Sequence, residues 1–167
     1  MLDVLTTYFD GEKNGGLFLA GLGILAIVAA TILVRPRFGL RSFAVTLIVL
    51  ALIEIAIGAG LYLRTDAQVG RLASQLQSDP ARFYAGEGAR MDRVQRSFII
   101  IQYVEIAVIA ICAIMAFAFK RRPVTMGVAL GLLIHAALLL AFDLIAERRG
   151  AVYLDAIRRA DLDAGVL

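Results

Sequence analysis

The stretch SFAVTLIVLALIEIAIGAGLYL, residues 42–63, decides the fold expected of this chain. It is predominantly apolar, and its single charged residue is Glu54. An α-helix of about 20 apolar residues is long enough to cross the hydrocarbon core of a bilayer. Three further stretches have the same character, and the charges of the chain fall almost wholly between the four. We therefore expect an all-α integral membrane protein with spans at residues 15–34, 42–63, 98–119 and 124–146.

The composition agrees with this class and argues against others. Hydrophobic residues make up 60% of the 167 residues, above the usual share of roughly 45–50% in soluble domains. The net charge of +3 is mild, and no basic stripe with a nucleic-acid-binding motif occurs, so we expect no nucleic-acid partner. Cys112 is the only cysteine, which excludes an internal disulfide and a cysteine metal cluster.

Two short connections indicate how the chain lies in the membrane. Residues 35–41 and 120–123 carry arginine or lysine without an acid, and each contains a proline. Basic short loops face the cytoplasm by the positive-inside rule, which places both termini and residues 64–97 outside it, as in a bacterial inner-membrane protein. Residues 64–97 hold six arginines and the segment after Phe142 holds four more. The rule counts these residues too, so they argue against this orientation.

The segments between the spans have helical patterns of their own. Val69, Leu72 and Leu76 continue the second span as an apolar stripe up to Ser78-Asp79-Pro80, a stop and restart signal. We predict a helical hairpin at residues 64–97, and an amphipathic C-terminal tail at residues 147–163.

At the N-terminus, residues 1–14 fit a short interfacial helix, because Leu2, Leu5 and Phe9 share one face. The whole, residues 1–167, is expected to form one membrane domain. The predicted fold is an up-down-up-down four-helix transmembrane bundle, with its second, third and fourth helices extended into a stalk on one side.

Three ionisable residues stand at similar depth inside the spans. Glu54 and His135 each lie 13 residues past a flanking arginine, and Glu105 lies 15 residues before Lys120. Charged or imidazole groups in hydrocarbon are costly, so they turn toward protein. We expect Glu54, Glu105 and His135 to meet in the interior, with Gln102 on the face of Glu105.

Such a polar cluster has several interpretations. It can fix the register of the helices, pass a proton or ion, line a ligand site or hold a divalent metal. A metal is disfavoured because a stable site usually wants four or more ligands and the paired ExxH motifs of di-iron bundles are absent. We therefore expect neither metal nor cofactor. Asp143 and Glu147 are interpreted either as an interfacial anchor or as the mouth of a polar path toward the cluster.

Small residues mark the expected helix contacts. Gly16, Ala20 and Gly23 form a stripe on the first span, and Gly127 and Gly131 form a GxxxG motif on the fourth. Small residues let neighbouring helix backbones approach closely in lipid. The GxxxG motif is consistent with packing inside one chain, and also with a homodimer.

No motif identifies a family or a reaction. Because catalytic signatures are missing and the predicted stalk can present a surface, the first hypothesis is a membrane protein that acts by binding. Its class would be an accessory or regulatory subunit, or a protective, immunity-type protein, whose protein partner binds the extramembrane helices. The alternative is a small proton- or ion-coupled transporter or channel with Glu54, Glu105 and His135 as its relay. An enzyme ranks third, since no nucleophile–base pair or phosphate-binding loop is visible.

Overall fold

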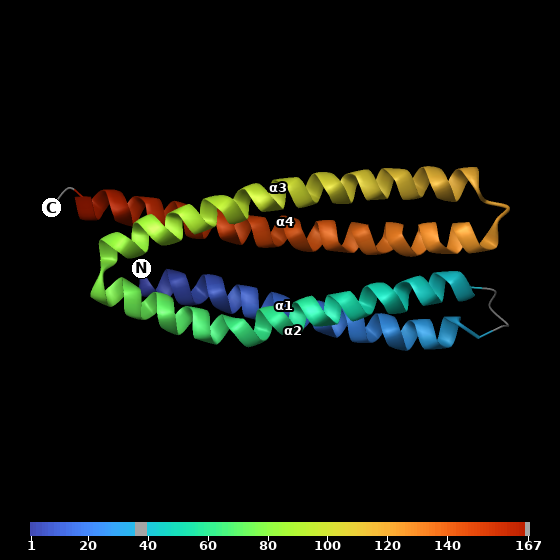
Figure 1. Cartoon of the computed structure of the whole chain (residues 1–167), viewed down its shortest axis with the longest axis horizontal. Helices are drawn as coiled ribbons and strands as arrows, with labels where there is room; N and C mark the ends of the chain where they lie inside the picture. The colour runs from blue at the N-terminus through green and yellow to red at the C-terminus, as the bar shows by residue number, and fades with distance from the viewer. Residues whose placement is uncertain (36–39, 166–167) are drawn as a thin grey trace.

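Four α-helices make up the fold in a computed structural model that describes residues 1–35 and 40–165. Helix α1 spans Leu2–Leu33, α2 spans Arg41–Ser78, α3 spans Pro80–Ala118 and α4 spans Pro123–Gly165 (Figure 1). No strand occurs in these two ranges, and the predicted all-α class is confirmed. Part of the first basic turn, residues 36–39, lies outside the described residues.

All four helices are long and apolar enough to cross a membrane. They contain 32 to 43 residues and so extend about 48–65 Å, well beyond a hydrocarbon core of about 30 Å. Only 11–22% of the most apolar part of each helix is buried inside the protein. Large apolar side chains such as Phe18, Leu25 and Phe117 are 63%, 66% and 79% exposed. Their outward orientation suits contact with lipid, and the chain is an integral membrane four-helix bundle.

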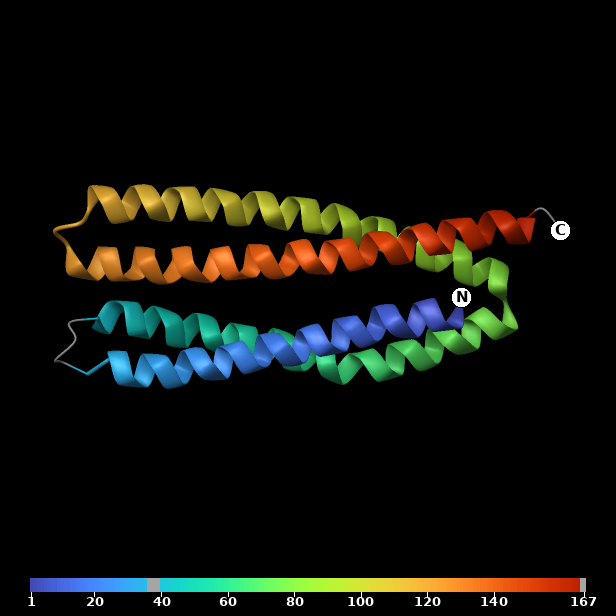
Figure 2. The same cartoon turned by 180° about the vertical axis from the view of Figure 1, so that it is seen from behind.

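The helices are arranged as two antiparallel hairpins, α1 with α2 and α3 with α4 (Figure 2). The main contact between the hairpins is α2 against α4, whereas α1 and α3 occupy the outer positions. The C-terminal ends of α1 and α3 lie at one end of the molecule (Figure 1). The connection between α2 and α3, the N-terminus and the C-terminal end of α4 lie at the other, which gives the up-down-up-down order.

Local sequence signals explain where α3 and α4 begin. The carboxylate of Asp79 accepts a hydrogen bond from the backbone N–H of Arg82 at 3.1 Å, as an N-cap residue does. Pro80 and Pro123 each occupy the first helical position, where the missing N–H of proline costs nothing. The stop and restart predicted at Ser78-Asp79-Pro80 is confirmed.

The part of the molecule beyond the spans, which we call the stalk, contains residues 2–14, 64–97 and 147–163. It has a core like that of a soluble helical bundle, and Leu5 and Phe9 of α1 are both 0% exposed within it. The prediction of a separate interfacial helix at residues 1–14 is wrong, because α1 is continuous and its apolar stripe packs against protein. The stalk therefore contains four helices rather than three. The other buried members of its core are Leu72, Phe83, Met91, Tyr153, Leu154 and Ile157.

Candidate functional site

The main interior feature is a cavity of about 400 Å³ between the four helices, where the stalk meets the spans. We call it the interhelical cavity. Every helix contributes to its wall, and most of the wall on the side of the membrane spans is aliphatic or aromatic. The residues that line it are Tyr8, Glu12, Leu19, Ile57, Leu61, Arg64, Arg90, Val94, Phe98, Ile101, Glu105, Leu139, Phe142, Asp143, Ala146 and Arg149.

Two carboxylates line this cavity from different helices. Glu105 comes from α3 and Asp143 from α4, and both side chains line the same space. Glu105 is 7% exposed, and its Oε2 atom has no hydrogen-bond partner among the described residues. A buried polar atom without a partner is costly in a native structure. Glu105 is therefore the least satisfied group of the site.

The stalk end of the cavity is lined by three arginines that already have acceptors. Arg64 pairs with Glu12 at 2.9 Å, and Arg90 pairs with the buried Glu87 at 2.6 Å. The guanidinium of Arg149 donates to the backbone carbonyl of Gly11. These contacts hold the three side chains to the wall of the stalk, and among the described residues no ion pair joins them to either carboxylate.

Behind Arg90 lies a buried polar cluster that the sequence did not reveal. Glu87 is 4% exposed and accepts a hydrogen bond from the Tyr153 hydroxyl at 3.3 Å. The ring of Tyr153 stacks on that of Tyr8 with centroids 4.4 Å apart, and Arg90 lies over the Phe9 ring. The cluster joins α1, α3 and α4 at the edge of the cavity.

The environment of this cluster changes the pKa values of its members. Burial, and then the nearby charge of Glu12, raise the pKa of Tyr8 to about 12. Burial also raises the pKa of Tyr153, and the charge of Glu87 adds to the effect. Burial alone would lower the pKa of Arg90, but its hydrogen bond to Glu87 and the nearby negative charges together outweigh burial and raise it. The tyrosines therefore remain neutral and Arg90 remains charged at neutral pH.

Deeper in the membrane, Glu54 and His135 form a separate pair. His135 Nδ1 lies 3.3 Å from Glu54 Oε1, and the two side chains are 12% and 5% exposed. The pair bridges α2 and α4, the two helices in contact at the centre of the bundle. Ile57 and Leu139, one turn further along each helix, line the interhelical cavity. The pair thus lies just beyond the inner end of the cavity.

The predicted polar trio is therefore divided between two places. The structure joins Glu54 to His135, whereas Glu105 lines the cavity with Asp143. Two physical reasons account for the difference. Helix α3 packs on α4 rather than on α2, and Glu105 lies two residues, about 3 Å, closer to the stalk than equal depth requires.

Gln102 and Glu147 also differ from their expected roles. The side-chain amide of Gln102 donates to Glu147 Oε2 at 2.8 Å, so this amide is directed to α4 rather than to Glu105. Gln95 donates to the backbone carbonyl of Glu147 at 3.2 Å. Among the described residues, Glu147 does not line the cavity, whereas Asp143 does. Only one of the two residues interpreted as a path mouth faces the interior.

The small residues lie at close helix contacts within the chain. A Cβ atom on Gly16 would come 2.7 Å from the carbonyl oxygen of Gly58 on α2, and Ala20 adjoins the same glycine. Gly23 fits against Ala51 of α2 in the same way. On α4, Gly127 and Gly131 fit against α2 at Ser42 and Thr46. The GxxxG face is thus occupied by α2 of the same chain, which favours the intramolecular interpretation.

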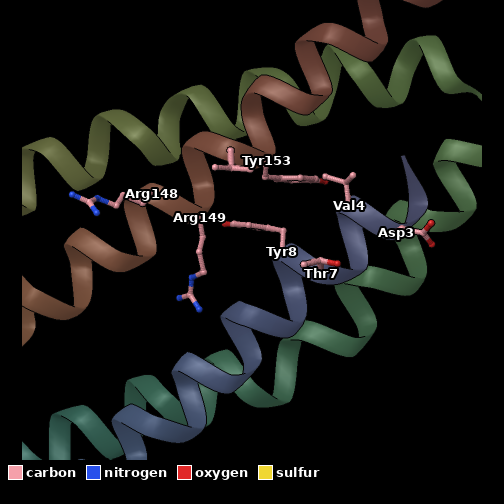
Figure 3. A pocket seen from close by; sticks show the side chains of 8 residues that line it. Asp3, Val4, Thr7, Tyr8, Arg148, Arg149 and Tyr153 are labelled. Carbon is pink, nitrogen blue, oxygen red and sulfur yellow. The ribbon is translucent and has the colours of Figure 1, made fainter.

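An open groove of about 520 Å³ lies on the stalk between α1 and α4 (Figure 3). We call it the stalk groove. Its lining is mostly apolar, with Asp3 toward one side and Arg148 toward the other. Tyr8 and Arg149 line both the stalk groove and the interhelical cavity, so these two side chains form the wall that the two spaces share. The remaining lining residues are Val4, Thr7, Val152 and Tyr153.

Sequence reasoning missed Glu87, Arg90 and Tyr8. One signal was available, because Glu87 and Arg90 lie three positions apart, the spacing of an ion pair on one helical face. The pair was hidden because residues 64–97 contain many charged side chains, and the sequence does not show which of these side chains are buried. Tyr8 was hidden because residues 1–14 were assigned to the membrane surface.

Fold and site together define the class of this protein, an integral membrane four-helix bundle with an extramembrane stalk and a polar, partly enclosed interior. No group of three or more histidine, cysteine, aspartate or glutamate side chains suited to a metal occurs in residues 1–35 and 40–165. Comparisons with protein-family models, with curated proteins and with solved structures found no match to this chain.

Proposed function

We propose that this protein acts by binding a protein partner through its stalk, as an accessory or protective subunit in a membrane. The observation that carries the proposal is the stalk groove. Val152 is 71% exposed and Val4 is 36% exposed there, although this part of the chain lies beyond the spans. Exposed apolar side chains gathered in water mark interaction sites. The packed core beneath them supports a preformed surface, which lowers the entropic cost of binding.

The lining of the stalk groove suggests what the partner presents. An apolar side chain fits between Val4 and Val152, and an acidic neighbour pairs with Arg148 at the rim. The experiment is affinity capture of the tagged full chain from its native membranes, followed by identification of the proteins that remain bound. Repeated recovery of the chain without a partner would argue against this function.

A matched pair of variants makes that capture specific. Val152 and Leu162 lie on the same helix and are both 71% exposed, but among them only Val152 lines the stalk groove. Val152→Asp is expected to abolish capture of the partner, while Leu162→Asp leaves it unchanged. Equal loss in both variants, or in neither, would show that the groove is not the binding surface.

A second function, proton- or ion-coupled transport, is favoured by a different observation. Glu54 and His135 are in contact inside the membrane, and Glu105 and Asp143 lie in the adjoining cavity. Ionisable groups within the membrane interior commonly belong to proton or ion pathways. Flux into proteoliposomes is the test, with Glu54→Gln and Glu105→Gln as variants. If neither substitution changes the flux or its pH dependence, this function is wrong.

The orientation we propose is that of a bacterial inner-membrane protein with the stalk outside the cytoplasm. The basic residues at the other end support it by the positive-inside rule. Many arginines of the stalk, such as Arg64, Arg90 and Arg158, are paired with acids, as residues of a folded extramembrane domain are. Labelling of single cysteines in residues 64–97, on a Cys112→Ala background, tests it in intact cells. If these cysteines are labelled only after the membrane is permeabilised, the stalk lies in the cytoplasm and the proposed orientation is wrong.

A further inference from the structure

We propose that the interhelical cavity is a binding site for an organic ammonium ion with an apolar body, held by Glu105 and Asp143. The two carboxylates and the apolar wall around them carry the inference. It does not rest on the binding of a protein by the stalk. Either proposal can fail without affecting the other, because different residues and different experiments test them.

The balance of charge in the cavity favours a positive ligand. Arg64 and Arg90 are neutralised by Glu12 and Glu87. Arg149 donates to a backbone carbonyl and keeps its charge, so it offsets one of the two remaining carboxylates. Glu105 and Asp143 have no ion-pair partner within residues 1–35 and 40–165. A carboxylate held in apolar surroundings either takes up a proton or binds a cation. With Glu105 and Asp143 ionised and one charge offset by Arg149, one negative charge remains, which a cation compensates and an anion would increase.

The position of Glu105 indicates that the cation carries an N–H group. Its Oε2 atom is buried and lacks a donor among the described residues, so a ligand N–H would satisfy it with a charge-assisted hydrogen bond. A hard metal ion fits this site poorly. Calcium and magnesium take six or more oxygen ligands, and the cavity offers two unpaired carboxylates.

The size of the cavity and its surroundings define the rest of the ligand. About 400 Å³ falls within the usual range of small-molecule sites, roughly 300–1,000 Å³. Leu139 and Phe142, next to Asp143 on α4, offer an aliphatic and aromatic surface to the ligand body. Tyr8 and Arg149 form the wall between the cavity and the stalk groove, so the ligand site adjoins the extramembrane side. The chemistry is that of a primary or secondary amine with an aryl or alkyl group.

The test compares three probes that share one body. The full chain is placed in phosphatidylcholine nanodiscs at neutral pH and titrated calorimetrically with 2-phenylethylammonium, with 2-phenylethanol and with 3-phenylpropanoate, after subtraction of empty discs. The expected result is saturable binding of the ammonium probe and none of the other two. Equal binding of the three probes, or no binding of the ammonium probe, would overturn the proposal.

Variants then locate the site. Glu105→Gln and Asp143→Asn are each expected to weaken binding of 2-phenylethylammonium by about tenfold or more, because each removes a charge from the contact. The control is Glu147→Gln, which lies one turn from Asp143 and outside the lining of the cavity, and which should bind as the wild type does. Unchanged binding in Glu105→Gln would contradict the assignment.

Two further measurements test whether the probe binds outside the cavity and whether the ligand is an inorganic cation. Leu139→Arg keeps both carboxylates but brings a positive charge into the cavity beside them, so it should exclude the ammonium probe while thermal unfolding shows a folded protein. Binding that survives this change would place the ligand elsewhere. Sodium chloride is titrated alone as well. If sodium chloride gives binding heat in the wild type but not in Glu105→Gln, and the ammonium probe does not bind, the ligand is an inorganic cation and the proposal is wrong.

Discussion

At the scale of single residues, Glu87 is the buried charge on which the stalk depends most. It pairs with Arg90 at 2.6 Å and accepts a hydrogen bond from Tyr153. Glu87→Ala leaves Arg90 without its acceptor, so we expect a loss of about 2 kcal/mol or more in the free energy of unfolding. Thermal or denaturant unfolding in mild detergent measures it.

The control for this prediction is another acid of α3. Asp92 pairs with Arg158 at 2.6 Å, but the two side chains are 38% and 61% exposed. An exposed ion pair contributes about 1 kcal/mol at most, so Asp92→Ala should cost clearly less than Glu87→Ala. Equal losses would mean that Glu87 is not buried as described.

Tyr8 gives a prediction about alkaline pH. Burial and the charge of Glu12 raise its pKa from 10.0 to about 12. Since the folded state holds this proton more tightly than the unfolded state, the stabilisation is complete below pH 10 and is lost as pH rises through about 12. Absorbance of tyrosinate should show a late-ionising phenol that is missing in Tyr8→Phe. A variant titration identical to that of the wild type would contradict the burial of Tyr8.

The sequence permits some of these residue-level conclusions and not others. Glu54 and His135 are evident because each is a lone ionisable group in an apolar span. Their partners are not, because pairing depends on how each helix is rotated and on which helices touch. Glu87 is one acid among many charges, and only the packing of α1 and α4 around it reveals its burial.

At the scale of elements, the contact of α1 with α2 depends on glycine. A Cβ on Gly16 would lie 2.7 Å from the carbonyl oxygen of Gly58, whereas a Cβ on Gly21 would meet nothing within 4 Å. Gly16→Leu should therefore separate the two backbones and destabilise the protein by about 1–3 kcal/mol. Gly21→Leu, on a face free of protein contacts, should be nearly neutral when unfolding is followed in the same detergent. A neutral Gly16→Leu would exclude this contact.

Helix ends were predictable, whereas the length of α1 was not. Asp79, Pro80 and Pro123 are local signals that act wherever they occur. Near the start of the chain, Gly11 and Gly15 weaken a helix and suggest a break. The helix continues because Leu5 and Phe9 pack into the core of the stalk, and because Glu12 and Lys13 pair with Arg64 and Asp66 of α2. Those contacts join parts of the chain that are more than fifty residues apart, so no local sequence pattern predicts them.

At the scale of the whole molecule, the fold class follows from four apolar stretches, but the arrangement of the two hairpins does not. Any pair of antiparallel hairpins satisfies the hydropathy pattern and the short turns. The observed arrangement depends on the α2–α4 contact at Gly127 and Gly131. This contact joins Glu54 to His135, closes the interhelical cavity and leaves the stalk groove open between α1 and α4.

The most direct test of this arrangement is a disulfide across the α2–α4 contact. A Cβ on Gly131 would lie 3.1 Å from the Cβ of Thr46, so a small outward shift of the helices brings the pair to the separation of about 3.5–4.5 Å found in disulfides. Thr46→Cys with Gly131→Cys, on a Cys112→Ala background, is oxidised in membranes and examined by gel electrophoresis without reductant. Gly21→Cys with Thr46→Cys serves as the control. Our account predicts an internally cross-linked monomer for the first pair and no cross-link for the second, whereas a disulfide-linked dimer, or no cross-link in the first pair, would contradict it.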